Sequence, residues 1–411
     1  MNTPQPLGPT TERQRYIILD ALRGFALFTI ILANFPEFGL WTFLSKEAQQ
    51  AMPSAGVDRI VRFLQYFLID GKGYTLFSLL FGCGFSIILE HAYQRGARGL
   101  RLFYRRMLIL MVIALCHLLL IWNGDILCLY AVLGMILPLF HKMTNKRLLL
   151  SAFVLLALPV GIDLFVELSG IVLSEPLYEA WWAKAHSVGI NESNFATWLR
   201  DATYYPTMFA FLSQGWIERM WEFVDGNRVF KVLGLFVLGY AIGRNRLYAK
   251  IAELKPQTVK LMQLSALVGI PLSAVYAWDS VNGHPLGLTV HSLLYFLSVV
   301  PMTFFYLTLL CLYSLRHNHS LMLRLFAAPG RMALTNYVGQ SLIGIIIYYG
   351  VGFGLGLSQG LYAIELTAVA VFLFQTAFSI LWLHGFRYGP TEWIWRMLTY
   401  GKWLPPFKDS H

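Results

Sequence analysis

Apolar stretches of eighteen or more residues recur along the chain and are separated by shorter polar segments. A helix needs about 20 apolar residues to cross a hydrocarbon core about 30 Å thick. The pattern therefore predicts an all-α, polytopic membrane helix bundle with about ten transmembrane helices, which form one domain over residues 17–385. The predicted spans are residues 17–36, 71–91, 103–122, 125–140, 147–167, 229–243, 259–278, 288–313, 332–351 and 361–385.

The longest predicted loop, residues 168–228, contains a further apolar segment. Its apolar core, Tyr204 to Trp216, is shorter than the roughly 17 residues that the thinnest span needs. An interfacial or re-entrant helix is favoured over a full span, because a span here would move the acidic stretch Glu218–Asp225 to the other side of the membrane. The tryptophans of this loop fit an interfacial aromatic belt: Trp181, Trp182, Trp198, Trp216 and Trp221.

Composition supports a membrane protein. Hydrophobic residues make up 57% of the chain and charged residues only 13%, which excludes an ordinary soluble domain. The four cysteines lie within or at the edge of apolar runs, so no disulfide framework is indicated. The amino-terminal segment lacks the small-residue cleavage site of a signal peptide, so we expect residues 1–16 to remain as a polar tail.

The net charge of +10 is distributed along the chain in a way that indicates topology. If the amino terminus faces the cytoplasm, most of the 32 lysines and arginines fall on the cytoplasmic side. This places both termini in the cytoplasm and residues 168–228 outside. It also makes the tryptophan- and arginine-rich segment 386–411 a cytoplasmic amphipathic segment. The positive charge is then explained by the orientation of the chain in the membrane and by attraction to anionic lipid. We therefore expect no nucleic-acid partner.

Three polar residues interrupt the first predicted span. Asp20, Arg23 and Asn34 fall on one stripe of a helix, with about 16 Å between Arg23 and Asn34. In one interpretation Asp20 and Arg23 form an ion pair at the membrane surface, and Asn34 is a carboxyl-terminal helix cap before Pro36. In the other interpretation the stripe lines a channel, because ionisable groups at membrane depth usually serve a function.

A second polar group is predicted at the outer ends of the spans. His117 precedes a short hairpin that contains Asp125, and Asn34 and Lys72 fall at the same depth. Histidine is the natural proton-transfer group near neutral pH. The alternative is structural: a hydrogen-bonded core histidine, with Asp125 as an amino-terminal helix cap.

The ninth predicted span carries a third polar group. It begins at Arg331, after a Pro-Gly pair, and four polar side chains follow on an arc of about 140°: Asn336, Tyr337, Gln340 and Ser341. They are candidate pocket-lining residues, or else they form hydrogen bonds between helices. The chain has no P-loop, no GxSxG motif and no recognised His/Cys metal spacing, so we expect no metal site.

Five motifs in order resemble the YeiB family of bacterial inner-membrane proteins. They are "LDALRGFALFTIILAN", "LFSLLFGCGFS", "HLLLIWNGDILCLYAVLG", "GRMALTNYVGQSL" and "FRYGPTEWIWRMLTYG". That family, a domain of unknown function, is in turn similar to the transmembrane acyltransferases. One of these is the lysosomal heparan-alpha-glucosaminide N-acetyltransferase, which moves acetyl from cytosolic acetyl-CoA to a sugar amine across the membrane.

The resemblance implies a bacterial inner-membrane location, acetyl-CoA or another acyl-CoA as donor, a small-molecule or glycan acceptor, and possible homodimerisation. In the lysosomal enzyme an asparagine at the place of Asn34 works with a histidine in the loop that follows. Here residues 35–58 contain no histidine, so His117 is the candidate to replace it.

The leading hypothesis is acyl transfer across the membrane. Arg23 and Arg331, with Asp20, would hold the phosphates of the donor, because guanidinium groups bind phosphate in a bidentate manner. His117, supported by Asp125, would be the general base, and Asn34 would stabilise the oxyanion. A transporter or flippase for an anionic metabolite or lipid, and a non-catalytic membrane partner protein, are the alternatives.

Overall fold

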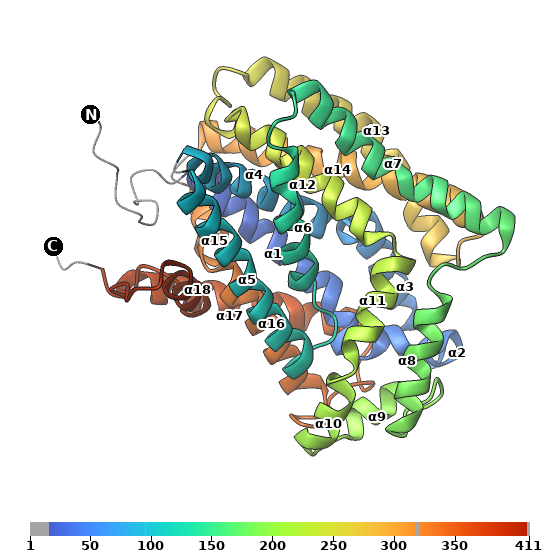
Figure 1. Ribbon diagram of the computed structural model, residues 1–411. Coiled ribbons are helices and arrows are strands. Elements are labelled where there is room, and N and C mark those ends of the chain that lie inside the picture. Colours follow the sequence, from blue (N-terminus) through green and yellow to red (C-terminus); the bar gives the residue numbers. More distant parts are fainter. Residues whose placement is uncertain (1–15, 95, 318–319, 409–411) are drawn as a thin grey trace, which may run out of the picture.

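The computed structural model describes residues 16–94, 96–317 and 320–408, and about four fifths of these residues lie in helices (Figure 1). The described residues form no strand beyond one isolated bridge between Phe386 and Phe407. The predicted all-α bundle is therefore confirmed. Of the predicted tail, only Tyr16 belongs to the described residues.

Seven segments of the described chain are long and apolar enough to cross a membrane. Their outer faces expose large apolar side chains such as Leu168, Leu267 and Leu381, as lipid-facing helices do. The segments correspond to α1 (Ile17–Phe38), α3 to α4 (Ala55–Leu64, a π-helical turn at Gln65–Ile69, and Lys72–Gln94), α5 (Ala97–Leu120), α7 (Asn145–Ser169), α13 (Lys255–Val281), α14 (Leu288–Arg316) and α17 (Leu361–Gly385).

The other three predicted spans are shorter helices in the interior of the bundle. They are α6 (Leu127–Ile136, continued by a 3-10 turn at Leu137–Phe140), α12 (Arg228–Arg244) and α16 (Ala333–Tyr348). α12 packs against α4 and α7, and Val232, Phe236 and Tyr240 on it are completely buried. α12 packs mostly against neighbouring helices and so does not need the length of a full span, whereas α6 and α16 each also expose apolar side chains such as Val132 and Ile346.

α1 lies at the centre of the bundle and contacts α4, α15 (Leu321–Arg331), α16 and α17. At the crossing with α15 the two backbones touch, because a Cβ on Gly24 would overlap the Phe326 carbonyl and one on Gly330 would overlap the Asp20 carbonyl. α1 continues through Pro36 to Phe38. Asn34 is thus inside the helix, and its interpretation as a helix cap is wrong.

The long loop folds into four short helices, none of which can span a membrane. The segment 203–217 is divided between the last two of them, which agrees with the prediction that it does not cross. Trp181 is 2% exposed and belongs to the core, so the predicted aromatic belt does not include it. The four helices are α8 (Glu175–Ser187), α9 (Phe195–Asp201), α10 (Tyr205–Leu212) and α11 (Gly215–Asp225).

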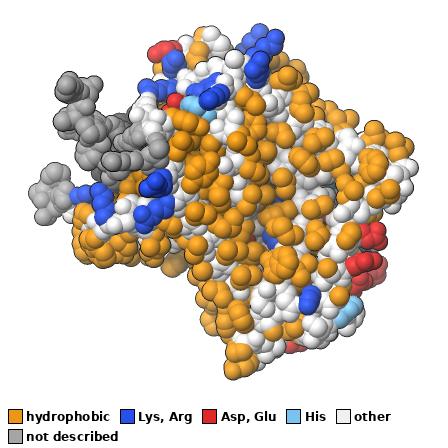
Figure 2. All heavy atoms as spheres, in the orientation of Figure 1, with side chains coloured by type: hydrophobic (Ala, Val, Ile, Leu, Met, Phe, Trp, Pro, Cys, Tyr) orange, Lys and Arg blue, Asp and Glu red, His pale blue; other side chains and the backbone are white. Residues whose placement is uncertain are grey.

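The bundle has two chemically different ends. We call the end where α1 begins and α18 (Pro390–Tyr400) lies the basic end, and the end where α1 stops and α8 to α11 lie the loop end (Figure 1). Figure 2 shows a broad hydrophobic surface between them, with most of the visible lysines and arginines on the basic side. α18 packs on α5 and α16, and the Trp395 indole donates to the Arg106 carbonyl at 2.9 Å.

Candidate functional site

A cavity of about 520 Å³ runs through the bundle along α1. Its wall includes residues of α1 from Asp20 to Glu37, which corresponds to a length of about 25 Å at 1.5 Å per residue. α4, α5, α6, α12, α16 and α18 supply most of the remaining wall. The volume lies in the range of small-molecule sites, about 300–1,000 Å³.

Arginines from four helices line the basic end of this cavity: Arg23, Arg106, Arg331 and Arg396. Arg23 forms an ion pair with Asp20 at 2.7 Å, and the Arg106 guanidinium stacks 4.2 Å from the Trp395 ring. Arg106 lies close enough to Arg23 and Arg396 to interact with both charges. This end therefore has the positive charge and the planar donors that suit phosphate groups.

Glu392 is a second buried carboxylate of the basic end, besides Asp20. It receives the backbone N–H groups of Leu334 and Thr335 at 2.7 and 3.2 Å, and the Thr335 hydroxyl at 2.5 Å. Burial raises the pKa of Glu392, whereas these hydrogen bonds act to lower it. Glu392 thus caps the first turn of α16 and attaches α18 to the cavity wall.

The loop end of the cavity is lined by polar residues of both signs. Asn34 and Glu37 project from α1, and Arg228 and Lys231 project from the start of α12. Two tyrosines join α4 to α14 here, because the Tyr74 and Tyr295 hydroxyls are 2.5 Å apart. The Lys231 ammonium lies 4.4 Å from the Tyr295 ring.

Arg219 of α11 lines the loop end of the cavity and lies against the hairpin between α5 and α6. It donates to the backbone carbonyls of Gly124, at 3.0 Å, and Asp125, and it pairs with Glu222. Beside it, burial raises the pKa of Glu218 to about 8, with repulsion from Glu222 acting in the same direction.

His117 lies behind the cavity wall and not on it. Its Nδ1 is 2.9 Å from the Asp125 carboxylate and its Nε2 is 3.0 Å from the Ser341 hydroxyl, and all three residues are at most 2% exposed. The other Asp125 oxygen accepts the Cys128 N–H at 2.7 Å, so Asp125 caps α6. The Tyr337 ring packs against the His117 ring and itself lines the cavity. Both ring nitrogens of His117 are therefore engaged away from the cavity.

The structure places the predicted site residues in two groups. Asp20, Arg23, Asn34, Arg331 and Tyr337 line the cavity. A second group, predicted to be catalytic or pocket-lining, lies outside it: Lys72, His117, Asp125, Asn336, Gln340 and Ser341.

These residues do not line the cavity, and most of their polar groups form hydrogen bonds to neighbouring helices or turns instead. Lys72 donates to the Tyr66 carbonyl at 2.6 Å, so it does not join His117 in one outer group. Asn336 donates to the Pro329 carbonyl and the Ser379 hydroxyl at 3.2 and 3.0 Å. Hydrogen bonding between helices, the alternative interpretation, describes Asn336 and Ser341.

Sequence reasoning missed most of the charged cavity residues. Glu37 follows Asn34 by one helical turn and continues the polar stripe of α1, a signal that was available. The missed basic residues count in the sequence only as topology signals, because they lie near span ends or in the segments between and after the spans: Arg106, Arg219, Arg228, Lys231 and Arg396.

Comparisons with known proteins place the chain among uncharacterized relatives. Residues 242–402 match the family model described as "Protein of unknown function (DUF418)". The chain is 30% identical to the uncharacterized protein YxaH of Bacillus subtilis, over 98% of this chain and 99% of that protein. It is 28% identical to the uncharacterized protein YeiB of Escherichia coli, over 94% and 96%. No solved structure matches the chain.

Proposed function

The chain belongs to the family of proteins of unknown function that contains YxaH and YeiB. From the charge and the length of its cavity, we propose that this membrane protein is an acyltransferase. In this proposal a phosphate-bearing acyl donor, of the acyl-coenzyme A class, binds at the basic end. Its acyl group is then transferred to an acceptor that enters at the loop end.

One observation carries this proposal: a single cavity connects four arginines at one end with Asn34 and Glu37 at the other. A donor with anionic phosphates and a long flexible arm fits a narrow cavity of this length and charge. The phosphates would meet Arg23, Arg106, Arg331 and Arg396, because charge-assisted hydrogen bonds to guanidinium are stronger than neutral ones.

The proposed chemical step needs an acceptor hydroxyl or amine, a base and an oxyanion donor. The acceptor atom attacks the thioester carbonyl carbon, its bond to that carbon forms, and the carbon–sulfur bond breaks. The Glu37 carboxylate takes the proton of the acceptor and returns it to the leaving thiolate. The Asn34 amide donates to the carbonyl oxygen while negative charge develops there.

His117 has a positioning role in this proposal. It holds Ser341 of α16 and Asp125 of the hairpin together, and its ring supports Tyr337 on the cavity wall. The backbone carbonyl of Asp125 also accepts a hydrogen bond from Arg219. The base is thus assigned to Glu37, which lines the cavity, and not to His117, which does not.

We also propose that the basic end faces the cytoplasm of a bacterial inner membrane. Lysine and arginine enrichment on the cytoplasmic side of membrane proteins supports this orientation. A cytoplasmic acyl-CoA would then enter at the arginines directly.

Binding of the donor tests the proposal. Acetyl-CoA, a longer acyl-CoA and free CoA are titrated onto the detergent-purified chain and onto Arg106→Gln and Arg105→Gln. Arg105 is the matched control, because it neighbours Arg106 but is exposed and lies outside the cavity. We expect Arg106→Gln to weaken binding by about ten- to hundredfold, the loss of one charge-assisted contact, and Arg105→Gln to leave it unchanged. Equal binding by both variants, or no binding of any of the three ligands, would overturn the proposal.

Transport of an anion is the second candidate, and the basic residues at the loop end favour it. Arg219, Arg228 and Lys231 line that end, so an anion would meet positive charge at both ends of the cavity. Proteoliposomes distinguish the two functions. A transporter accumulates a labelled anion without consuming a thioester, whereas an acyltransferase releases one free CoA thiol for each acyl group transferred.

A further inference from the structure

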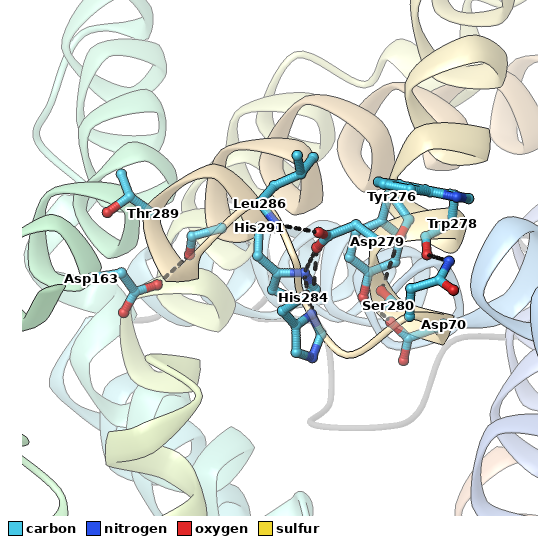
Figure 3. A network of polar contacts seen from close by, with 12 residues as sticks. Asp70, Asp163, Tyr276, Trp278, Asp279, Ser280, His284, Leu286, Thr289 and His291 are labelled. Carbon is cyan, nitrogen blue, oxygen red and sulfur yellow. Dashed lines mark hydrogen bonds and ion pairs between the residues drawn. The ribbon is translucent and has the colours of Figure 1, made fainter.

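The turn between α13 and α14 brings three metal-ligating side chains to one point at the loop end (Figure 3). The His291 Nδ1 is 2.8 Å from the Asp279 Oδ2, the His284 Nδ1 is 3.4 Å from the same oxygen, and the two imidazole nitrogens are 2.9 Å apart. The spacing of these residues in the sequence is not a recognised metal motif. Only the turn brings them together.

The backbone conformation of the turn directs the His284 side chain toward Asp279 of α13. His284 has a φ of +60°, a left-handed conformation that is uncommon for residues with a side chain, and it lies between Gly283 and Gly287 with φ of +79° and +84°. The His284 N–H donates to the Asp279 carbonyl at 2.9 Å, and the Gly287 N–H donates to the His284 carbonyl at 3.1 Å. Strained backbone of this kind persists where the surrounding structure specifies it, often at a ligand site.

The Asp279 carboxylate is completely buried. Its Oδ1 accepts the Leu286 N–H at 3.1 Å, which leaves Oδ2 for the two imidazoles. Within residues 16–94, 96–317 and 320–408, its ion-pair partners are these two histidines and no lysine or arginine. A buried carboxylate needs a counter-charge, and a metal cation between the three atoms would supply it.

The two imidazoles could also share a bound cation. When two ring nitrogens face each other at 2.9 Å, only one of them can carry a proton on that side. A neutral histidine presents a lone pair there, so a cation would satisfy both nitrogens and the carboxylate oxygen together. Neutral imidazole and carboxylate are ordinary ligands of divalent zinc.

The three distances match one face of a zinc tetrahedron. Zinc bonds of about 2.0–2.1 Å at tetrahedral angles separate ligand atoms by about 3.3 Å. The observed separations of 2.8, 2.9 and 3.4 Å differ from that value by about half an ångström or less. We propose that Asp279, His284 and His291 bind one divalent transition-metal ion of the zinc class, with a fourth position open to water.

The site adjoins the cavity described above. His291 and Tyr276 line that cavity, and their rings pack with centroids 5.2 Å apart. Tyr276 in turn donates to the Asp70 carboxylate at 2.5 Å. A bound metal would fix the α13–α14 turn as part of the loop-end wall, and the partly exposed His284 would give the ion an entry path. This inference does not depend on the proposed acyl transfer.

Metal binding is tested on the detergent-purified full chain, prepared without a polyhistidine tag. The chain is loaded with zinc and dialysed, its metal content is measured, and its zinc affinity is obtained by competition with a chelating dye. His284→Asn and His291→Gln remove one ligand each, and asparagine tolerates the left-handed backbone at position 284. His186→Ala is the control, because His186 is an exposed histidine at the same end.

We expect one zinc per chain in the wild type and in His186→Ala, with an affinity at least about tenfold higher than in either ligand variant. Zinc at a hundredfold excess over its dissociation constant should raise the thermal midpoint of the wild type by about 2–5 °C and leave that of the ligand variants unchanged. Equal zinc content in all four proteins, or none in the wild type, would overturn the proposal. The thermal midpoints without zinc show whether each variant is folded.

Discussion

At the scale of single residues, Asn34 and Glu37 carry the chemistry that we propose. They lie one helical turn apart on α1 and both line the loop end of the cavity. Neighbouring residues differ sharply in role, because Phe35 and Phe38 on the same turn are completely buried in the apolar core. The division follows from the periodicity of the helix, which directs residues three apart to one side.

Glu37→Gln tests the assigned base. We expect the variant to lose at least about 100-fold in turnover, the usual contribution of a positioned base, while its affinity for the acyl donor stays within about twofold. Steady-state rates and donor titrations measure the two effects separately. Glu47→Gln, at an exposed glutamate of α2 (Lys46–Ala51), should change neither quantity. Full turnover by Glu37→Gln would remove Glu37 from the mechanism.

Glu218 gives a prediction about pH. Its pKa is raised to about 8 in the folded chain from an ordinary value of 4.5, so the folded state retains a proton that the unfolded state has lost. The free energy of unfolding should therefore fall as pH rises from about 4.5 to 8. Glu218→Gln removes this contribution, and its thermal midpoint should fall less between pH 5 and pH 8 than that of the wild type. The exposed Glu179→Gln on α8 should retain the wild-type slope, and an unchanged slope in Glu218→Gln would refute the assignment.

At the scale of elements, the crossing of α1 and α15 sets the basic end of the cavity. Gly24 and Gly330 allow the two backbones to touch, and this contact places Arg331 at the end of α15 beside Asp20 and Arg23 on the cavity wall. A side chain at the crossing would move α15 and, with it, one of the four arginines.

Gly330→Ala tests this close approach. The added methyl group would overlap the Asp20 carbonyl, and we expect a loss of about 1–3 kcal/mol in stability together with weaker donor binding. Gly161→Ala in α7 is the matched control, because nothing lies within 4 Å of its Cβ position. That variant should be as stable as the wild type or up to about 1 kcal/mol more stable. Thermal unfolding in detergent measures both, and equal stability of the two variants would contradict the interpretation of the crossing.

At the scale of the whole molecule, the two ends of the bundle differ in charge and in architecture. α18 lies at the basic end and lines the cavity there, and α8 to α11 lie at the loop end. A cavity that reaches polar residues at both ends of such a bundle suits a reaction between partners that approach from opposite sides of a membrane.

Labelling from one side of the membrane tests the proposed orientation. Single cysteines are introduced at Ser187 on α8 and at Lys146 on α7, both exposed, in a chain whose native exposed Cys116 is replaced by alanine. An impermeant maleimide added to intact spheroplasts should modify Ser187→Cys and spare Lys146→Cys until the membrane is opened. The reverse pattern would show that the basic end faces outward.

The sequence alone determined the fold class, most of the spans and the stripe on α1. These depend on local periodicity and on the cost of placing polar groups in lipid, which a single helix expresses in its own residues. Asp20, Arg23 and Asn34 could be assigned to one face for this reason. Arg106 and Arg396 are equally visible in the sequence, but topology alone explains their positive charge there.

Only the tertiary structure decided which polar residues share a space. The sequence makes His117 the candidate base and Tyr337 only a candidate pocket-lining residue, yet packing puts Tyr337 on the cavity wall and His117 behind it. Asp279, His284 and His291 meet because a left-handed turn reverses the chain between two long helices. Which polar side chains meet depends on how the helices rotate and cross. Contacts between residues far apart in the chain set this packing, and the periodicity of a single helix does not reveal these contacts.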